Sequence, residues 1–96
     1  VMDNQHRKIS GYRELTQEDI DLMNRVKAKG AELLELQREV SAHLVKCQCT
    51  LAVEGPTEEF SRFLKAEPRR WASIAKTDIQ TGVMALVRAI AQPEGC

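Results

Sequence analysis

Residues 69–93 read as one helix that is apolar on more sides than a short chain can cover. Apolar residues at helical spacing form a stripe expected to face the core: Ala72, Ala75, Ile79, Val83, Leu86 and Ile90. Beside it lies a second stripe, the small-residue stripe: Trp71, Ala75, Gly82, Ala85 and Ala89. A chain of 96 residues cannot cover both stripes itself. We therefore expect other copies of the chain to cover them.

The composition favours helices. Hydrophobic residues make up 43% of the chain but aromatic residues only 4%, so the core must be aliphatic and rich in alanine. Five glycines and three prolines are too few for a many-turned β structure. The prediction is a single all-α domain.

A first long helix should begin at Gln17 and run to about residue 53. Thr16 is a good N-cap, and Asp19 three residues later completes an approximate capping box. Its apolar seam steps by three or four residues, close to a coiled-coil pattern. The seam residues are Ile20, Met23, Val26, Gly30, Leu33, Leu36, Val40, Leu44, Cys47 and Leu51.

The chain should then turn and return antiparallel. Gly55 can end the first helix, and Thr57 can cap a short helix within residues 57–66. Pro68 suits the first turn of the final helix, which should end near Gln92. The predicted organisation is an N-terminal arm over 1–15, a helical hairpin over 16–93 and a tail over 94–96.

Several functional classes are disfavoured. Fourteen basic and fourteen acidic residues cancel, which argues against long nucleic acid as a partner. No apolar run approaches a membrane span. His6 and His43 have no obvious Cys or Ser partner, and no phosphate-binding loop or zinc pattern occurs, so we expect neither an enzyme nor a cofactor or metal site. Three cysteines and no recognisable signal peptide fit a reducing cytoplasm.

Two polar clusters remain. Tyr12 of the arm offers a flat face on which a nucleobase can stack, and Lys27 offers a charge for phosphate. Lys27 lies roughly 16 Å along the helix from Thr16, so a neighbouring subunit's arm could reach it more simply. The alternative is a surface tyrosine beside a solvated basic face.

The second cluster is a polar edge on the final helix. It comprises Arg69, Ser73, Lys76, Thr77 and Gln80. In a single hairpin this would be a solvent-facing edge. Around a symmetry axis it would become a ring of repeated donors suited to a cyclic anion.

Two blocks, KISGYRELTQEDIDLMNRVKAKG and WASIAKTDIQTGVMALVRAIAQP, resemble the phage anti-CBASS sponge family, which is related to the sponges that counter Thoeris defence. CBASS is a bacterial defence in which cyclic oligonucleotides signal infection. The resemblance implies a helical homo-hexamer in the host cytoplasm that binds cyclic nucleotides without cleaving them. It implies that Tyr12 stacks on a base of a cyclic dinucleotide and that Lys27 contacts this ligand. A second site, for cyclic trinucleotides, would involve Arg69, Arg70, Lys76 and Thr77.

Two rival interpretations remain open. A helical-hairpin protein–protein interaction module of phage origin explains the periodicity equally well, but it leaves Tyr12 and the basic residues without a role. A phosphodiesterase would need a base and usually a metal, for which no ligand cluster is visible.

Overall fold

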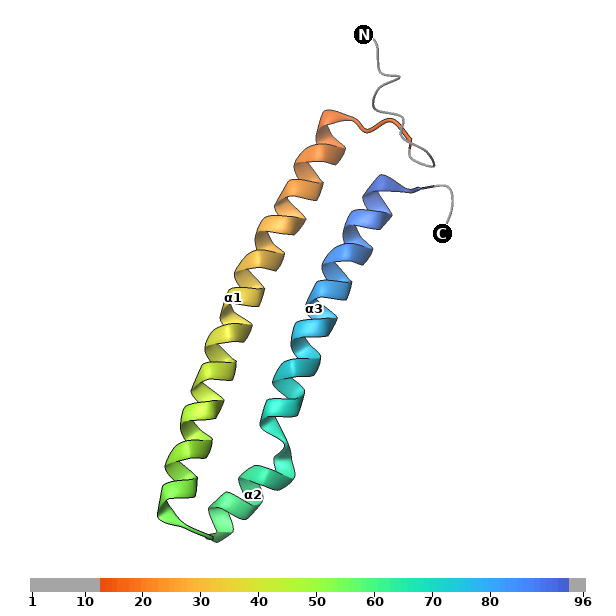
Figure 1. Ribbon diagram of the computed structural model, residues 1–96. Coiled ribbons are helices and arrows are strands. Elements are labelled where there is room, and N and C mark those ends of the chain that lie inside the picture. Colours follow the sequence, from red (N-terminus) through yellow and green to blue (C-terminus); the bar gives the residue numbers. More distant parts are fainter. Residues whose placement is uncertain (1–12, 94–96) are drawn as a thin grey trace.

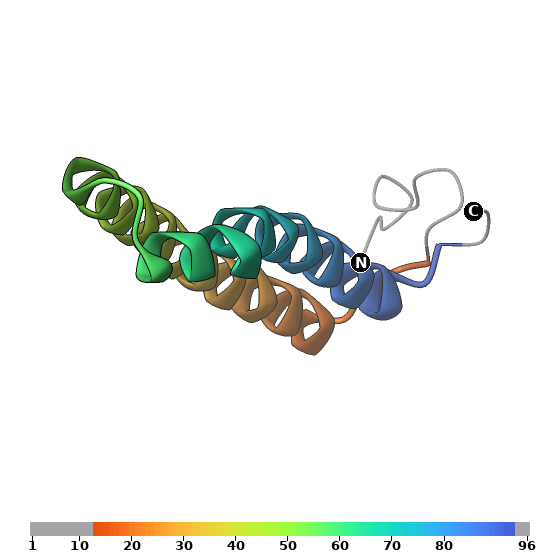
Figure 2. The same cartoon turned by 90° about the horizontal axis from the view of Figure 1, so that it is seen from below.

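The computed structural model describes residues 13–93, which form three helices. They are α1 (Gln17–Glu54), α2 (Glu58–Ala66) and α3 (Pro68–Ala91). α1 and α3 run antiparallel along most of their length, and α2 turns the chain between them (Figures 1 and 2). The predicted all-α helical hairpin is confirmed. The structure is elongated, with principal extents of 68 × 23 × 15 Å.

Local chemistry explains where the helices begin and end. The Thr16 side chain accepts a hydrogen bond from the backbone N–H of Asp19 at 3.1 Å, and the Asp19 carboxylate accepts one from the Thr16 N–H at 3.0 Å. This reciprocal capping box satisfies two backbone donors that the first turn leaves without partners. Gly55 follows α1 with φ of 92°, a value that favours glycine. The Thr57 hydroxyl caps α2 by accepting from the Phe60 N–H.

The joint between α2 and α3 carries a feature that the sequence pattern did not predict. Glu67 is both the C-cap of α2 and the N-cap of α3, and its φ of 51° places it in the left-handed region. A non-glycine residue in that region is uncommon. Pro68 at the start of α3 lacks an N–H, which the first turn of a helix does not need. The chain has already reversed direction before α2, and the short joint bends it between α2 and α3 (Figure 1).

The core lies between α1 and α3, but two stripe predictions were partly wrong. On α3, Leu86 is 55% exposed, and Val87 takes the half-buried place beside α1. On α1, the seam passes through Leu34, Gln37 and Ser41. The predicted seam residues on the neighbouring face are exposed: Leu33, Leu36 and Val40.

The reason for this shift is a close approach of the two helices. Gly30 is buried against Val83, and it sets which face of α1 meets α3. The apolar residues of α1 cover two adjoining faces, so periodicity alone did not decide between them. The second face forms an exposed line, the α1 outer stripe: Leu22, Leu33, Leu36 and Val40. The small-residue stripe is exposed as well, apart from Ala75, which is half-buried.

Candidate functional site

Lys27 lies exposed on α1 and lines two overlapping hollows beside the contact between α1 and α3. The first hollow has a volume of about 380 Å³, and Arg88 of α3 also lines it. Its other walls are mainly apolar: Met23, Val83, Met84, Val87, Ala91 and Pro93. The second, of about 460 Å³, adds Gly30, Ala31, Leu34 and Gln80. An apolar wall edged by cations suits a ligand that combines flat apolar rings with phosphates.

The sequence singled out Lys27 but not Arg88. The two residues are far apart in the chain, and only the antiparallel packing of α1 and α3 brings both to one hollow. Tyr12, the predicted stacking residue, lies outside the described residues. Its chain neighbour, Arg13, is the first residue that the structure describes.

Arg69 and Arg70 line a different hollow, of about 390 Å³, at the start of α3. Ser41 and Val45 of α1 form the opposite wall, and Ser73 lies one turn further along α3. Arg69 donates a hydrogen bond to the Gln48 side-chain oxygen at 3.3 Å. Two guanidinium groups and two hydroxyls thus edge one hollow, a donor set that suits an anion.

The neighbours of Arg70 hold its guanidinium near the outer surface. It lies 3.7 Å from a Glu67 carboxylate oxygen and 5.3 Å from the centroid of the exposed Trp71 ring. The latter is a cation–π contact. Lys76 and Thr77 are exposed further along α3 and do not line this hollow. A single hairpin therefore brings together Arg69 and Arg70, but not all four residues predicted for the second site.

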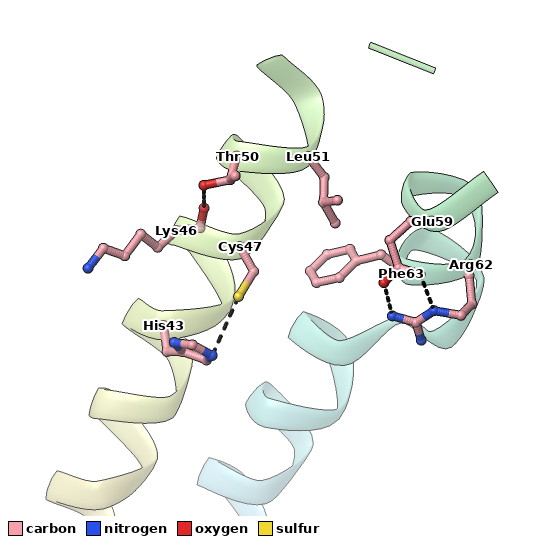
Figure 3. A pocket seen from close by; sticks show the side chains of 8 residues that line it. All are labelled: His43, Lys46, Cys47, Thr50, Leu51, Glu59, Arg62 and Phe63. Carbon is pink, nitrogen blue, oxygen red and sulfur yellow. Dashed lines mark hydrogen bonds and ion pairs between the residues drawn. The ribbon is translucent and has the colours of Figure 1, made fainter. Parts of the chain in front are cut away.

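A third hollow, of about 460 Å³, separates the end of α1 from α2 (Figure 3). Phe63 is 7% exposed and points towards α1 beside Leu51. On α1, the His43 Nε2 lies 3.4 Å from the Cys47 Sγ. The expectation that His43 has no cysteine partner was therefore wrong. The i, i+4 spacing, which places both residues on one helix face, was the signal that could have predicted this contact.

Two charged residues at the third hollow, Glu59 and Arg62, pair with each other within α2. Arg62 donates to both carboxylate oxygens of Glu59, with Nε to Oε1 at 2.9 Å. This contact lowers the pKa of the Glu59 carboxyl and raises the pKa of Arg62. Across residues 13–93, no three His, Cys, Asp or Glu side chains gather as a metal site would require. None of the helices in this range is long and apolar enough to span a membrane.

Comparison with known proteins identifies close relatives. The family described as "Acb2/Tad1, hairpin domain" matches residues 7–91. The matched range includes Tyr12 and every other candidate ligand-binding residue. Anti-CBASS protein 2 of Pseudomonas phage JBD67 is 65% identical over 108 aligned residues, which cover 99% of this chain and 100% of that protein.

Proposed function

We propose that this chain, which belongs to the Acb2/Tad1 hairpin-domain family, is a phage immune-evasion protein that sequesters cyclic oligonucleotide second messengers. The observation that carries the proposal is the 65% identity, over almost the whole chain, to a protein named for its anti-CBASS role. Bound messenger cannot activate a host effector, so the protein acts by mass action inside the infected cell. It needs high affinity and high copy number rather than turnover.

The hollow beside Lys27 supports a cyclic dinucleotide as the first ligand. A cyclic dinucleotide carries two phosphodiesters and two flat bases. Lys27 and Arg88 supply cationic donors at the edge of one apolar hollow, and Tyr12 supplies an aromatic face for a base. Stacking on such a face contributes roughly 1–3 kcal/mol per base.

Assembly is the second part of the proposal. The exposed α1 outer stripe and the small-residue stripe favour a homo-oligomer, for which we propose a hexamer. Between subunits, the arm of one chain could reach Lys27 of another. Around a symmetry axis, the Arg69 and Arg70 hollow could also meet Lys76 and Thr77 of neighbouring chains, forming a site for cyclic trinucleotides.

Calorimetry with cyclic dinucleotides tests the first site. Tyr12→Ala and Lys27→Ala should each weaken binding at least tenfold while the oligomeric mass stays constant. Lys29→Ala is the matched control, because Lys29 is an exposed lysine on the same helix that pairs with Glu32 at 3.8 Å. Unchanged affinity in both variants would remove this site from the proposal.

Two further measurements separate the remaining alternatives. Ligand recovered intact after heat denaturation of the complex supports sequestration, whereas cleaved ligand would indicate a phosphodiesterase. Arg69→Ala/Arg70→Ala should remove the thermal stabilisation caused by a cyclic trinucleotide and leave that caused by a cyclic dinucleotide. If no cyclic oligonucleotide stabilises the wild type, the interaction-module alternative is favoured.

A further inference from the structure

The two overlapping hollows beside Lys27 contain polar groups that no contact within the described chain uses. Lys27 of α1 lines both hollows, and Gln80 of α3 lines the second. Among the described residues that line either hollow, Gln80 alone has an uncharged polar side chain. The Lys27 ammonium and the Gln80 amide have no hydrogen-bond or ion-pair partner within residues 13–93. Both groups are therefore available to a ligand.

The register of the hairpin places these two groups at opposite ends of the second hollow. Gly30 and Val83 face each other across the contact between α1 and α3. Lys27 precedes Gly30 by three residues on α1. Gln80 precedes Val83 by three residues on α3, which runs in the opposite direction (Figure 1). With a rise of about 1.5 Å per residue, Lys27 and Gln80 lie roughly 9 Å apart along the hairpin axis.

Apolar groups bound the space between Lys27 and Gln80. Val83 and Met84 follow Gln80 by one helical turn, so they lie on the same face of α3. Met84 is 69% exposed, which leaves most of its side chain free to contact a ligand. Such a wall suits the flat face of a nucleobase. In a nucleotide, the sugar and the base ring separate the phosphate from the outer edge of the base by a span comparable to that between Lys27 and Gln80.

We propose that Gln80 is a specificity-determining residue that recognises the edge of an adenine, an inference that rests on the proposed function. With a phosphate at Lys27, the base of the same nucleotide lies over Met84 and presents its edge to Gln80. The amide oxygen accepts a hydrogen bond from the N6 amino group of adenine, and the amide nitrogen donates one to N7. Guanine presents two acceptors at this edge, O6 and N7, one of which would face the amide oxygen. Gln80 therefore favours adenine over guanine.

The first test compares 3′,3′-cyclic di-AMP with 3′,3′-cyclic di-GMP by calorimetry on the full-length protein. The wild type should bind cyclic di-AMP roughly tenfold more tightly, because a bidentate contact discriminates between bases by about this factor. Gln80→Ala should make the two affinities nearly equal. Gln80→Arg should reverse the preference, because a guanidinium donates to both O6 and N7 of guanine. The two ligands carry equal charge, so the added cation strengthens both and the ratio of affinities reports on the bases.

Gln17→Ala is the matched control. Gln17 is an exposed glutamine of α1 that lines neither hollow, and its amide nitrogen donates to the Asp21 carboxylate at 2.9 Å. This variant should keep the wild-type ratio of affinities. Gln80 is also exposed, so both variants at this position should keep the helix content and the unfolding temperature of the wild type.

The 7-deaza analogue of cyclic di-AMP tests the contact with N7 directly. It replaces this acceptor with a C–H group and keeps the charge and nearly the size of the base. The wild type should bind the analogue severalfold more weakly than cyclic di-AMP, whereas Gln80→Ala should bind both alike. An analogue that loses as much affinity for Gln80→Ala as for the wild type overturns the inference. So does a wild type that binds cyclic di-AMP and cyclic di-GMP equally.

Failure of this inference and failure of the proposed function give different results. If Lys27→Ala weakens the binding of both cyclic dinucleotides while Gln80→Ala keeps the wild-type ratio, only the role of Gln80 fails. If Gln17→Ala changes the ratio as much as Gln80→Ala does, the role of Gln80 fails as well. If the wild type binds neither ligand, the proposed function fails, and the role of Gln80 fails with it.

Discussion

Gly30 of α1 and Val83 of α3 lie in a tight contact between the two long helices. A Cβ atom placed on Gly30 would overlap the Val83 Cγ2, so no other residue fits without movement of α3 or of the valine. Glycine inside a helix costs about 1 kcal/mol relative to alanine. The contact explains why the chain keeps a glycine there, and it determines which faces of the helices meet.

Gly30→Ala should therefore destabilise the hairpin despite the better helix propensity of alanine. Overpacking of a tight contact typically costs about 1–3 kcal/mol, which exceeds the gain in propensity. Urea unfolding followed by circular dichroism measures the difference. Val83→Ala in the same chain should recover part of the loss by making room. A double variant no more stable than Gly30→Ala would show that the overlap with Val83 is not the cause.

Gln37 lies on the same face of α1, two turns further along, and is 9% exposed. Its amide nitrogen donates to the Ala72 carbonyl oxygen at 2.9 Å and to the Ser41 hydroxyl oxygen at 3.0 Å. The first hydrogen bond links α1 to α3 and favours one register of the hairpin. Gln37→Ala should cost about 1–3 kcal/mol in urea unfolding, because it removes these bonds and leaves a space.

Gln37→Met separates packing from hydrogen bonding at this position. Methionine fills a similar volume, and the Ala72 carbonyl can keep its partner within α3. We expect Gln37→Met to lose clearly less stability than Gln37→Ala. Equal losses would mean that the amide hydrogen bonds, rather than the filled volume, account for the effect.

Helix boundaries were predictable because they depend on residues close together in the chain. Thr16 and Asp19 form a cap within one turn, and Gly55 ends α1 through its own backbone conformation. The inward faces were less predictable, because α1 is apolar on two adjoining sides and the choice depends on Val83 of another helix. The left-handed Glu67 had no local signal of the kind that glycine provides.

The residues of the candidate site also differ in whether the sequence alone could predict them. Residue type alone leaves Lys27 open between a ligand contact and a solvated basic face, and the resemblance to the sponge family favours the ligand contact. Arg88 could not be proposed in this way, since it reaches the hollow of Lys27 only through the packing of α1 against α3, and the contact of Arg13 with Ile90 likewise depends on tertiary structure. Sequence patterns within one helix contain no information about such pairs.

Asp19 should make the stability of the hairpin depend on pH. Its pKa is lowered from 3.8, first by the hydrogen bond from the Thr16 backbone and also by the Thr16 hydroxyl and Arg13. A lowered pKa in the folded state means that the carboxylate stabilises the fold fully above about pH 3.8. This contribution is lost as the pH falls further, through the folded-state pKa.

Asp19→Asn provides the comparison, because it removes the charge at nearly constant size. The wild type should be more stable than Asp19→Asn at pH 7, and the difference should shrink as the pH falls below 3.8. Thermal unfolding across this range measures it. A difference that stays constant with pH would contradict a charged Asp19 as the stabilising group.

The exposed apolar stripes should control assembly rather than the folding of one chain. Leu36 of the α1 outer stripe is 53% exposed, so Leu36→Glu should leave most of the packing between α1 and α3 intact. At a subunit interface, however, the new carboxylate would be desolvated without a partner, which is costly. We expect sedimentation to show smaller particles with the helix content retained.

Val53→Glu is the control, because Val53 is 87% exposed at the end of α1, outside the stripe, and its change should leave the mass unaltered. If Leu36→Glu keeps the wild-type mass, another surface forms the interface, and Ala85→Glu in the small-residue stripe becomes the decisive variant.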